Sequence, residues 1–128
     1  MNNKTESLKE KLRQALSSTA RVISDDLGIT TKKNIKNSEK QELIELENLN
    51  SKNEFIKARA ETDSKALKKK FSNESIFKKN LPSSSSCRSL YTITEKIRYE
   101  KLGSKMLKGI DKNLRDNYIQ MILSLIHI

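Results

Sequence analysis

The stretch from Leu90 to Leu114 carries the longest helical repeat of apolar positions in the chain. One stripe combines apolar and polar residues three or four positions apart: Ile93, Ile97, Glu100, Ser104, Leu107, Ile110 and Leu114. This spacing predicts a helix whose apolar face is covered by other elements. We therefore predict one helix over residues 87–117. Gly103 and Gly109 lie within it, and glycine inside a helix indicates either a bend or another backbone passing close.

Two further helices are predicted before this one. The first spans residues 7–24, begins with a capping box of Ser7 and Glu10, and has a mainly apolar face of Leu8, Leu12, Ala15, Leu16, Thr19, Ala20 and Ile23. The second spans residues 53–80, and its stripe includes a carboxylate: Ile56, Ala60, Asp63, Leu67 and Phe71. The lysines at 68–70 suit the negative end of the helix dipole.

Polar segments separate these helices. Residues 32–52 read as a polar linker, in which residues 41–50 suit a short helix or a partly ordered arm, and Leu27–Thr31 suits a short strand. Residues 81–86, with Pro82 and a run of serines, form the clearest break, because proline disfavours helix for the residue before it. The sequence predicts a mainly α fold, a small helical domain of about three main helices with flexible polar linkers.

Composition bounds the size of the core and the kind of partner. The chain has 128 residues, which favours one domain, and only 34% of them are hydrophobic, which leaves little material for a core. Its net charge of +10 is typical of proteins that bind nucleic acid, an anionic membrane surface or an acidic protein segment. The positive charges are spread among glutamates, so a solvated surface explains them equally well. Aromatic residues, at 5%, are too few for single-strand-binding platforms.

The expected location is the cytoplasm. Cys87 is the only cysteine, so no intramolecular disulfide can form, which fits a reducing compartment. The N-terminus has no apolar core of a secretory signal, and no run approaches the roughly 18 apolar residues that span a bilayer. We expect a cytoplasmic protein without a membrane partner.

Residues that usually carry catalysis or bind metals are missing or isolated. No glycine-rich phosphate loop is present, His127 is the only histidine, and no Ser/His/Asp or Cys/His arrangement exists. We expect no catalytic, cofactor-binding or metal-binding residue in this chain. The charges set into the apolar stripes are more informative, because an unpaired buried charge is costly. They either lie in water at a stripe edge or form a polar network: Asp63, Glu95, Arg98 and Glu100.

Three blocks of sequence carry a resemblance to a known family. The first helix contains Leu16, Thr19, Arg21 and Ile23, and the second contains the block Arg59–Leu67. The third block is the longest: Tyr91, Glu95, Arg98, Glu100, Leu102, Gly103, Met106, Gly109, Ile110, Asn113 and Leu114. In this order the blocks resemble the N-terminal region of the CobT subunit of aerobic-pathway, ATP-dependent cobaltochelatase.

The chain also departs from that family. Ala60 replaces a glycine, and the family often carries histidines and an aspartate where this chain has Phe71, Ser72, Asn73 and Phe77. The resemblance fades beyond Tyr118, where the sequence becomes abruptly apolar. No Asp-x-Ser-x-Ser motif occurs, so we expect the family's C-terminal von Willebrand A-like domain to be absent and the chain to be an N-terminal fragment.

The resemblance implies a role in cobalamin biosynthesis, in a complex that inserts cobalt into the corrin ring and forms cobalt–nitrogen bonds. In that complex the AAA+ subunit CobS hydrolyses ATP with Mg²⁺, and the large subunit CobN holds the corrin and the metal. The chain is then expected to be a non-catalytic assembly region of a ring-like oligomer, with no cofactor of its own.

The residues expected to form a partner interface or an inter-helix polar network are Arg59, Asp63, Tyr91, Glu95, Arg98, Glu100, Gly103, Gly109 and Asn113. The alternative is a small basic helical nucleic-acid-binding module, whose affinity falls steeply with salt because binding releases counterions. The resemblance disfavours nucleic acid as a partner. A third alternative is a largely disordered arm that folds on its partner.

Overall fold

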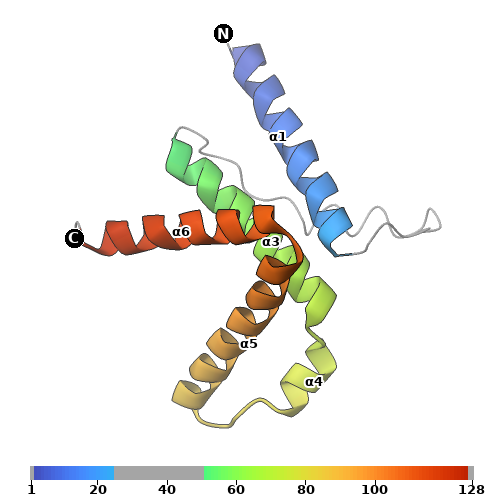
Figure 1. Ribbon diagram of the computed structural model, residues 1–128, viewed down its shortest axis with the longest axis vertical. Helices are drawn as coiled ribbons and strands as arrows, with labels where there is room; N and C mark the ends of the chain where they lie inside the picture. Colours follow the sequence, from blue (N-terminus) through green and yellow to red (C-terminus); the bar gives the residue numbers. More distant parts are fainter. Residues whose placement is uncertain (1, 25–50, 127–128) are drawn as a thin grey trace, which may run out of the picture.

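The computed structural model describes residues 2–24 and 51–126, and within these ranges every regular element is a helix. The helices are α1 (Asn2–Ile23), α3 (Lys52–Phe71), α4 (Glu74–Lys79), α5 (Ser85–Met106) and α6 (Lys108–Ile126) (Figure 1). The prediction of a mainly α fold is confirmed. The strand predicted at Leu27–Thr31, the short helix or arm at 41–50 and the linker 32–52 up to residue 50 lie outside the described residues.

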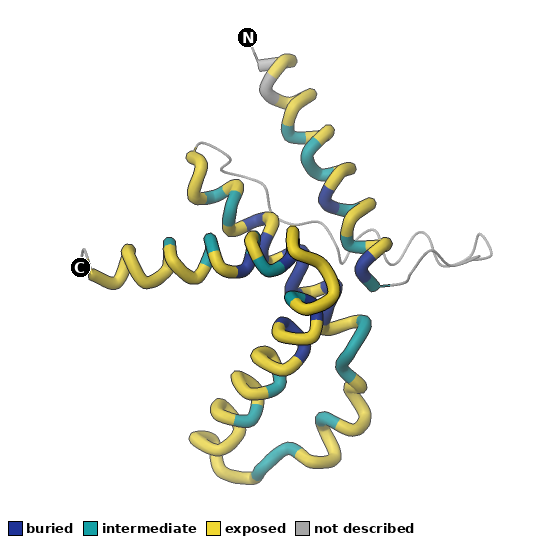
Figure 2. The backbone as a smooth tube through the Cα atoms, viewed as in Figure 1, coloured by how far each residue is buried: buried dark blue, intermediate teal, exposed yellow. Residues whose placement is uncertain are grey.

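Helix α3 is the element on which α1, α5 and α6 pack. It contacts α1, α5 and α6, and α5 also contacts α6. In Figure 1, α3 passes behind the point where α5 and α6 meet, and α1 and α6 extend away from that point. The buried residues gather at this crossing (Figure 2). The core cluster consists of Ile23, Ala60, Ala66, Leu67, Tyr99, Ile110 and Leu114, and a smaller cluster joins Leu16 to Ala58.

The stripe expected along α3 is the one that the fold buries. Ala60, Asp63 and Leu67 are at most 3% exposed, and Leu67 is completely covered. The small alanine side chains at 58, 60 and 66 let neighbouring helices approach closely. Ser51 caps the helix by accepting a hydrogen bond from the backbone N–H of Glu54. The last turn carries the three lysines at 68–70, as the helix dipole favours.

The single helix predicted over 53–80 is divided in two. Ser72 leaves the helical conformation, with φ −101° and ψ 139°. The side chain of Asn73 then accepts a hydrogen bond from the N–H of Ile76 and caps α4. Asparagine competes well for backbone donors at a helix start, which explains a new helix beginning here. The connection from α4 to α5 follows at residues 80–84 and overlaps the predicted break at 81–86, whose last two serines already belong to α5.

Helix α1 starts earlier than expected. It begins at Asn2, so Ser7 lies inside the helix and the predicted capping box is wrong. Glu10 instead forms an ion pair of 2.6 Å with Arg13. Leu16 and Ile23 are buried as predicted, but Leu8 is 62% exposed because α1 extends beyond the elements that could cover it (Figure 2).

The predicted helix over 87–117 is also two helices, and the break falls at neither glycine. Leu107 has an extended backbone, with φ −137° and ψ 124°, between the end of α5 and the start of α6. The change of direction lets Ile110 and Leu114 of α6 enter the core. The other apolar members of the predicted stripe, Ile93, Ile97 and Leu107, are 46–60% exposed, so the expectation that they are covered is wrong. Helix α6 continues to Ile126.

Candidate functional site

Glu100 is a buried carboxylate that joins α5 to both α3 and α6. Its side chain is only 8% exposed. Oε1 accepts a 2.6 Å hydrogen bond from the Ser64 hydroxyl, and Oε2 accepts a 2.5 Å hydrogen bond from the Tyr118 phenol. Lys96 Nζ, one turn earlier on α5, lies 3.9 Å from Oε1. Donors of this kind offset the cost of burying a charge, so one carboxylate holds three helices together.

Two tyrosines beside Glu100 keep their protons at neutral pH. Burial, followed by the hydrogen bond to Glu100, raises the pKa of Tyr118 well above its usual range. Burial also raises the pKa of Tyr99, and a hydrogen bond with Ser64 partly opposes that shift. Both phenols therefore remain protonated even well above neutral pH, and Tyr118 uses its proton to donate to Glu100.

A second buried carboxylate joins α3 to α6 on another side of the crossing. Asp63 is 3% exposed, and its Oδ2 accepts a 2.8 Å hydrogen bond from the side-chain amide of Asn113. Burial raises the pKa of Asp63, while the Asn113 hydrogen bond and the positive charge of Arg59 oppose the increase. Arg59 itself is exposed, with its guanidinium 5.6 Å from the centre of the Phe55 ring. The structure therefore brings Arg59, Asp63 and Asn113 together.

Glu95 and Arg98 tie the C-terminal end of α3 to α5. Arg98 donates two hydrogen bonds of 2.7–2.8 Å to Glu95 and a third, of 2.7 Å, to the backbone carbonyl of Phe71. Glu95 also accepts a 2.7 Å hydrogen bond from the Ser72 hydroxyl. The hydrogen bonds from Arg98 lower the pKa of Glu95 to about 2. These contacts satisfy a carbonyl that the end of a helix leaves unpaired.

Gly103 and Gly109 have different surroundings. Gly103 is buried, and a Cβ atom at this position would overlap the side chain of Leu67, lying 2.9 Å from its Cγ. Because Gly103 has only a hydrogen atom where other residues have a Cβ, α5 can approach α3 closely at this point. Gly109 is exposed, and a Cβ there would meet nothing within 4 Å. Tyr91 contacts Phe77 of α4, with ring centroids 5.1 Å apart.

Ser64, Ser72 and Tyr118 were not among the expected site residues, although each donates a hydrogen bond to one of the expected carboxylates. Tyr118 lies four residues after the buried Leu114, so helical spacing could have placed it on the inward face of α6. Ser64 lies next to Asp63 within the second sequence block, but its partner on α5 is 36 residues away, and sequence spacing does not reveal such a pair.

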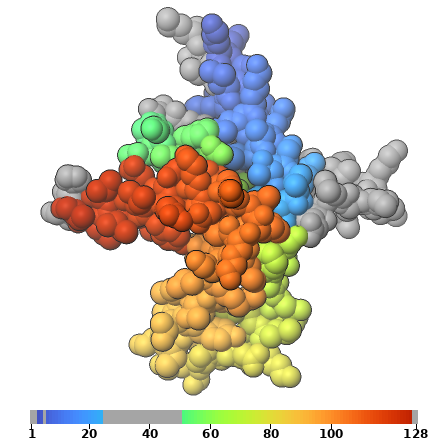
Figure 3. Space-filling model, in the orientation of Figure 1, coloured from blue at the N-terminus to red at the C-terminus, as the bar shows by residue number. Residues whose placement is uncertain are grey.

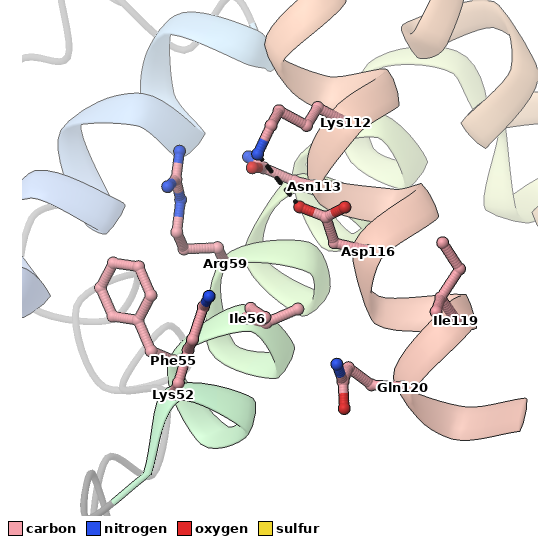
Figure 4. A pocket seen from close by; sticks show the side chains of 9 residues that line it. All are labelled: Lys52, Phe55, Ile56, Arg59, Lys112, Asn113, Asp116, Ile119 and Gln120. Atoms are coloured by element: carbon pink, nitrogen blue, oxygen red, sulfur yellow. Dashed lines mark hydrogen bonds and ion pairs between the residues drawn. The ribbon is translucent and has the colours of Figure 1, made fainter. Parts of the chain in front are cut away.

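Two hollows flank the crossing of α3 and α6. The first, of about 460 Å³, lies between the N-terminal half of α3 and α6 (Figure 4). In Figure 4, Phe55 and Arg59 of α3 lie across from Lys112, Asp116 and Gln120 of α6, and Lys112 pairs with Asp116 at 3.2 Å. The second, of about 390 Å³, is here called the junction groove. It is bounded by α3, α5 and α6 and has Glu100 and Tyr118 in its wall.

Large apolar side chains lie exposed on α5 and α6, two of the helices that bound the junction groove. We call residues 118–126 the α6 extension, because α6 projects there beyond the rest of the molecule (Figure 3). It contains no charged residue. Its exposed apolar side chains, between 38% and 70% accessible, are Tyr118, Ile119, Met121, Ile122, Leu123, Leu125 and Ile126. On α5, Leu90, Ile93 and Ile97 are 56–67% exposed. Helices that are apolar around their circumference are normally covered by other protein.

The described ranges contain no cluster of His, Cys, Asp and Glu side chains suited to holding a metal ion. Within the same ranges, no helix combines the length and the apolar character that crossing a membrane requires. Cys87 is exposed and has a free thiol.

Comparison with known proteins identifies one family. A family model described as Cobalamin biosynthesis protein CobT matches residues 6–124. The match includes all three blocks on which the resemblance was based, and it continues past Tyr118, so the expectation that the likeness fades there is wrong. No curated protein and no solved structure shows a significant match to the chain.

Proposed function

Because the chain belongs to the CobT family, whose members act in cobalamin biosynthesis, we propose that it is a non-catalytic assembly region of a cobaltochelatase subunit. In this proposal the complex inserts cobalt, its substrate metal, into the corrin ring. The proposed partners are the AAA+ subunit CobS, which hydrolyses ATP with Mg²⁺, and the large subunit CobN, which holds the corrin. The chain contributes to a ring-like oligomer and binds no cofactor itself.

The observation that carries the proposal is the exposed α6 extension. Met121, Ile122 and Leu125 are 52–70% exposed in a segment without charges, although a third of the whole chain is charged. Exposed patches of this kind mark surfaces that another protein covers. Because the extension is continuous with the face of α6 that carries Ile110 and Leu114 into the core, a partner can extend that core outward.

The hydrogen bonds made by the buried and partly buried acids support an assembly role over a catalytic one. Glu100, Asp63 and Glu95 each accept hydrogen bonds from a second helix or from the segment that follows α3. Their removal would loosen the helix crossing. These three carboxylates are therefore engaged in holding the helices in place.

The distribution of positive charge supports a protein partner over nucleic acid. Exposed cations lie on all the described helices, and several pair with a carboxylate on their own helix, as in Lys57–Glu61, Lys78–Glu74 and Arg115–Asp111. Phosphate-binding surfaces instead gather lysine and arginine on one face.

Binding to purified CobS and CobN tests the proposal. We expect the unmodified chain to bind at least one of them, and the double substitution Met121→Lys and Leu125→Lys to weaken that binding about tenfold or more because it places charge in an apolar contact. The matched control is Val22→Lys with Ile76→Lys, which alters equally exposed apolar residues on α1 and α4. Failure of both subunits to bind the unmodified chain would contradict the proposal.

A further inference from the structure

The junction groove has charged and apolar parts that are separated in space. Its wall includes the buried Glu100 and the partly exposed Tyr118, and Glu100 accepts hydrogen bonds from the hydroxyls of Tyr118 and Ser64. Because Lys96 Nζ also lies 3.9 Å from Oε1 of Glu100, this carboxylate presents no unpaired charge to an occupant.

The rim of the groove is positive. Lys65 and Lys68 of α3 and Lys96 of α5 line it and are exposed. Glu61 is the other acidic residue of the lining besides the buried Glu100, and it lies 3.9 Å from Lys57 on its own helix. The rim therefore suits carboxylates of an incoming chain, because exposed lysines steer acidic groups toward a surface.

Two apolar flanks extend the groove. On α5, Ile97 and Ile93 lie three and seven residues before Glu100, so they share its face of the helix. On α6, Met121, Ile122 and Leu125 lie three, four and seven residues after Tyr118 and share its face. Glu100 and Tyr118 face each other across the junction, so residues that share their faces lie on the facing sides of α5 and α6. The two helices diverge from this junction (Figure 3).

We propose that the junction groove and its two flanks bind an amphipathic helix of a partner protein, with an apolar face bordered by carboxylates. This proposal rests on the assembly function proposed above and specifies the chemistry of the partner. The apolar face covers the flanks on α5 and α6, and the carboxylates pair with Lys65, Lys68 and Lys96. A second copy of this chain fits less well, because it carries a net charge of +10 and would meet the same lysine rim.

Charge neutralisation at the rim tests the proposal. The groove variant carries Lys65→Gln and Lys68→Gln, and the matched control carries Lys11→Gln and Lys79→Gln, which remove the same charge from α1 and α4. Each intact chain is titrated with purified CobS and with CobN over a range of salt concentrations, and circular dichroism checks the helix content. We expect the groove variant to lose about tenfold or more in affinity at low salt and the control about twofold or less. The difference between them should shrink as salt screens the lysines.

A second variant tests the flank on α5. Ile93→Ser with Ile97→Ser should weaken the same binding without reducing thermal stability, because both side chains are more than half exposed. If the unmodified chain and both variants bind a subunit equally well, the groove proposal is wrong while the assembly function stands. If neither subunit binds the unmodified chain, both the groove proposal and the proposed assembly function are wrong. Self-association or RNA binding that depends on the rim lysines, with subunit binding unaffected, would also overturn the groove proposal.

Discussion

The phenol of Tyr118 donates a 2.5 Å hydrogen bond to Oε2 of Glu100, and this contact joins α6 to α5 where both cross α3. Ser64 of α3 donates to the other oxygen of the same carboxylate. These two hydrogen bonds fix the position of the junction-groove wall and of the start of the α6 extension.

Removal of the Tyr118 hydroxyl should destabilise the fold. In Tyr118→Phe the buried Glu100 keeps the hydrogen bond from Ser64 but loses the one from α6. We expect the free energy of unfolding to fall by about 1–3 kcal/mol, because a buried acceptor is left with an unmade bond. Urea denaturation followed by circular dichroism measures this change. Tyr91→Phe, at a ring that packs against Phe77, serves as the control, and an equal loss in both variants would contradict the role of Tyr118.

The two glycines of the predicted central helix should respond to alanine in opposite directions. Gly103→Ala places a methyl group against Leu67, and we expect a loss of about 1–3 kcal/mol in the free energy of unfolding. Gly109→Ala meets nothing within 4 Å and should gain up to about 1 kcal/mol from helix propensity. Thermal unfolding of both variants gives the comparison. Equal stability of the two variants would show that α5 does not approach α3 as described.

The interaction of Glu95 with Arg98 should make stability depend on acid. The pKa of Glu95 falls from 4.5 to about 2 in the folded chain. A carboxyl with a lowered folded pKa stabilises the fold above its unfolded pKa, and this contribution is lost as the pH falls from 4.5 toward 2. Glu95→Gln and Arg98→Gln should therefore both flatten the decline of stability across this interval, as denaturant titrations at each pH would measure. A decline as steep as in the unmodified chain would contradict the assignment.

Asp63 should show the opposite dependence. Burial raises its pKa, so its neutral form favours the fold, and the contribution is lost as the pH rises through the folded pKa. Asp63→Asn keeps a hydrogen-bonding side chain opposite Asn113 and removes the titrating charge. We expect this variant to be at least as stable as the unmodified chain at neutral pH, and a large loss of stability there would show that the charge itself is needed.

Helical periodicity predicted much of α3 because its pattern matches its burial. Asp63 stands in a stripe with Ala60 and Leu67, and all of these residues are buried. Periodicity also grouped Ile93 and Ile97 with Ile110 and Leu114, but it shows only which residues share a face. Since α5 and α6 turn apart at Leu107, the second pair is covered and the first is not.

Other features could not be predicted from the sequence, each for its own physical reason. The break at Leu107 involves an extended conformation that any residue adopts, so the nearby glycines were a misleading signal. Ser7 fitted a capping box, but serine is also tolerated inside a helix, and α1 extends past it. The partners of Glu100 come from two other helices, and only the packing of α3, α5 and α6 brings them together.

Photo-crosslinking from the α6 extension tests the assembly account most directly. A photoreactive residue placed at Ile122 or at the control position Ile76, both more than half exposed, is activated in the complex reconstituted with CobS and CobN. We predict crosslinks to one of these subunits from position 122 and none from position 76. Crosslinks from position 76 alone, or from neither position in an assembled complex, would contradict the claim that the α6 extension is a partner-binding surface.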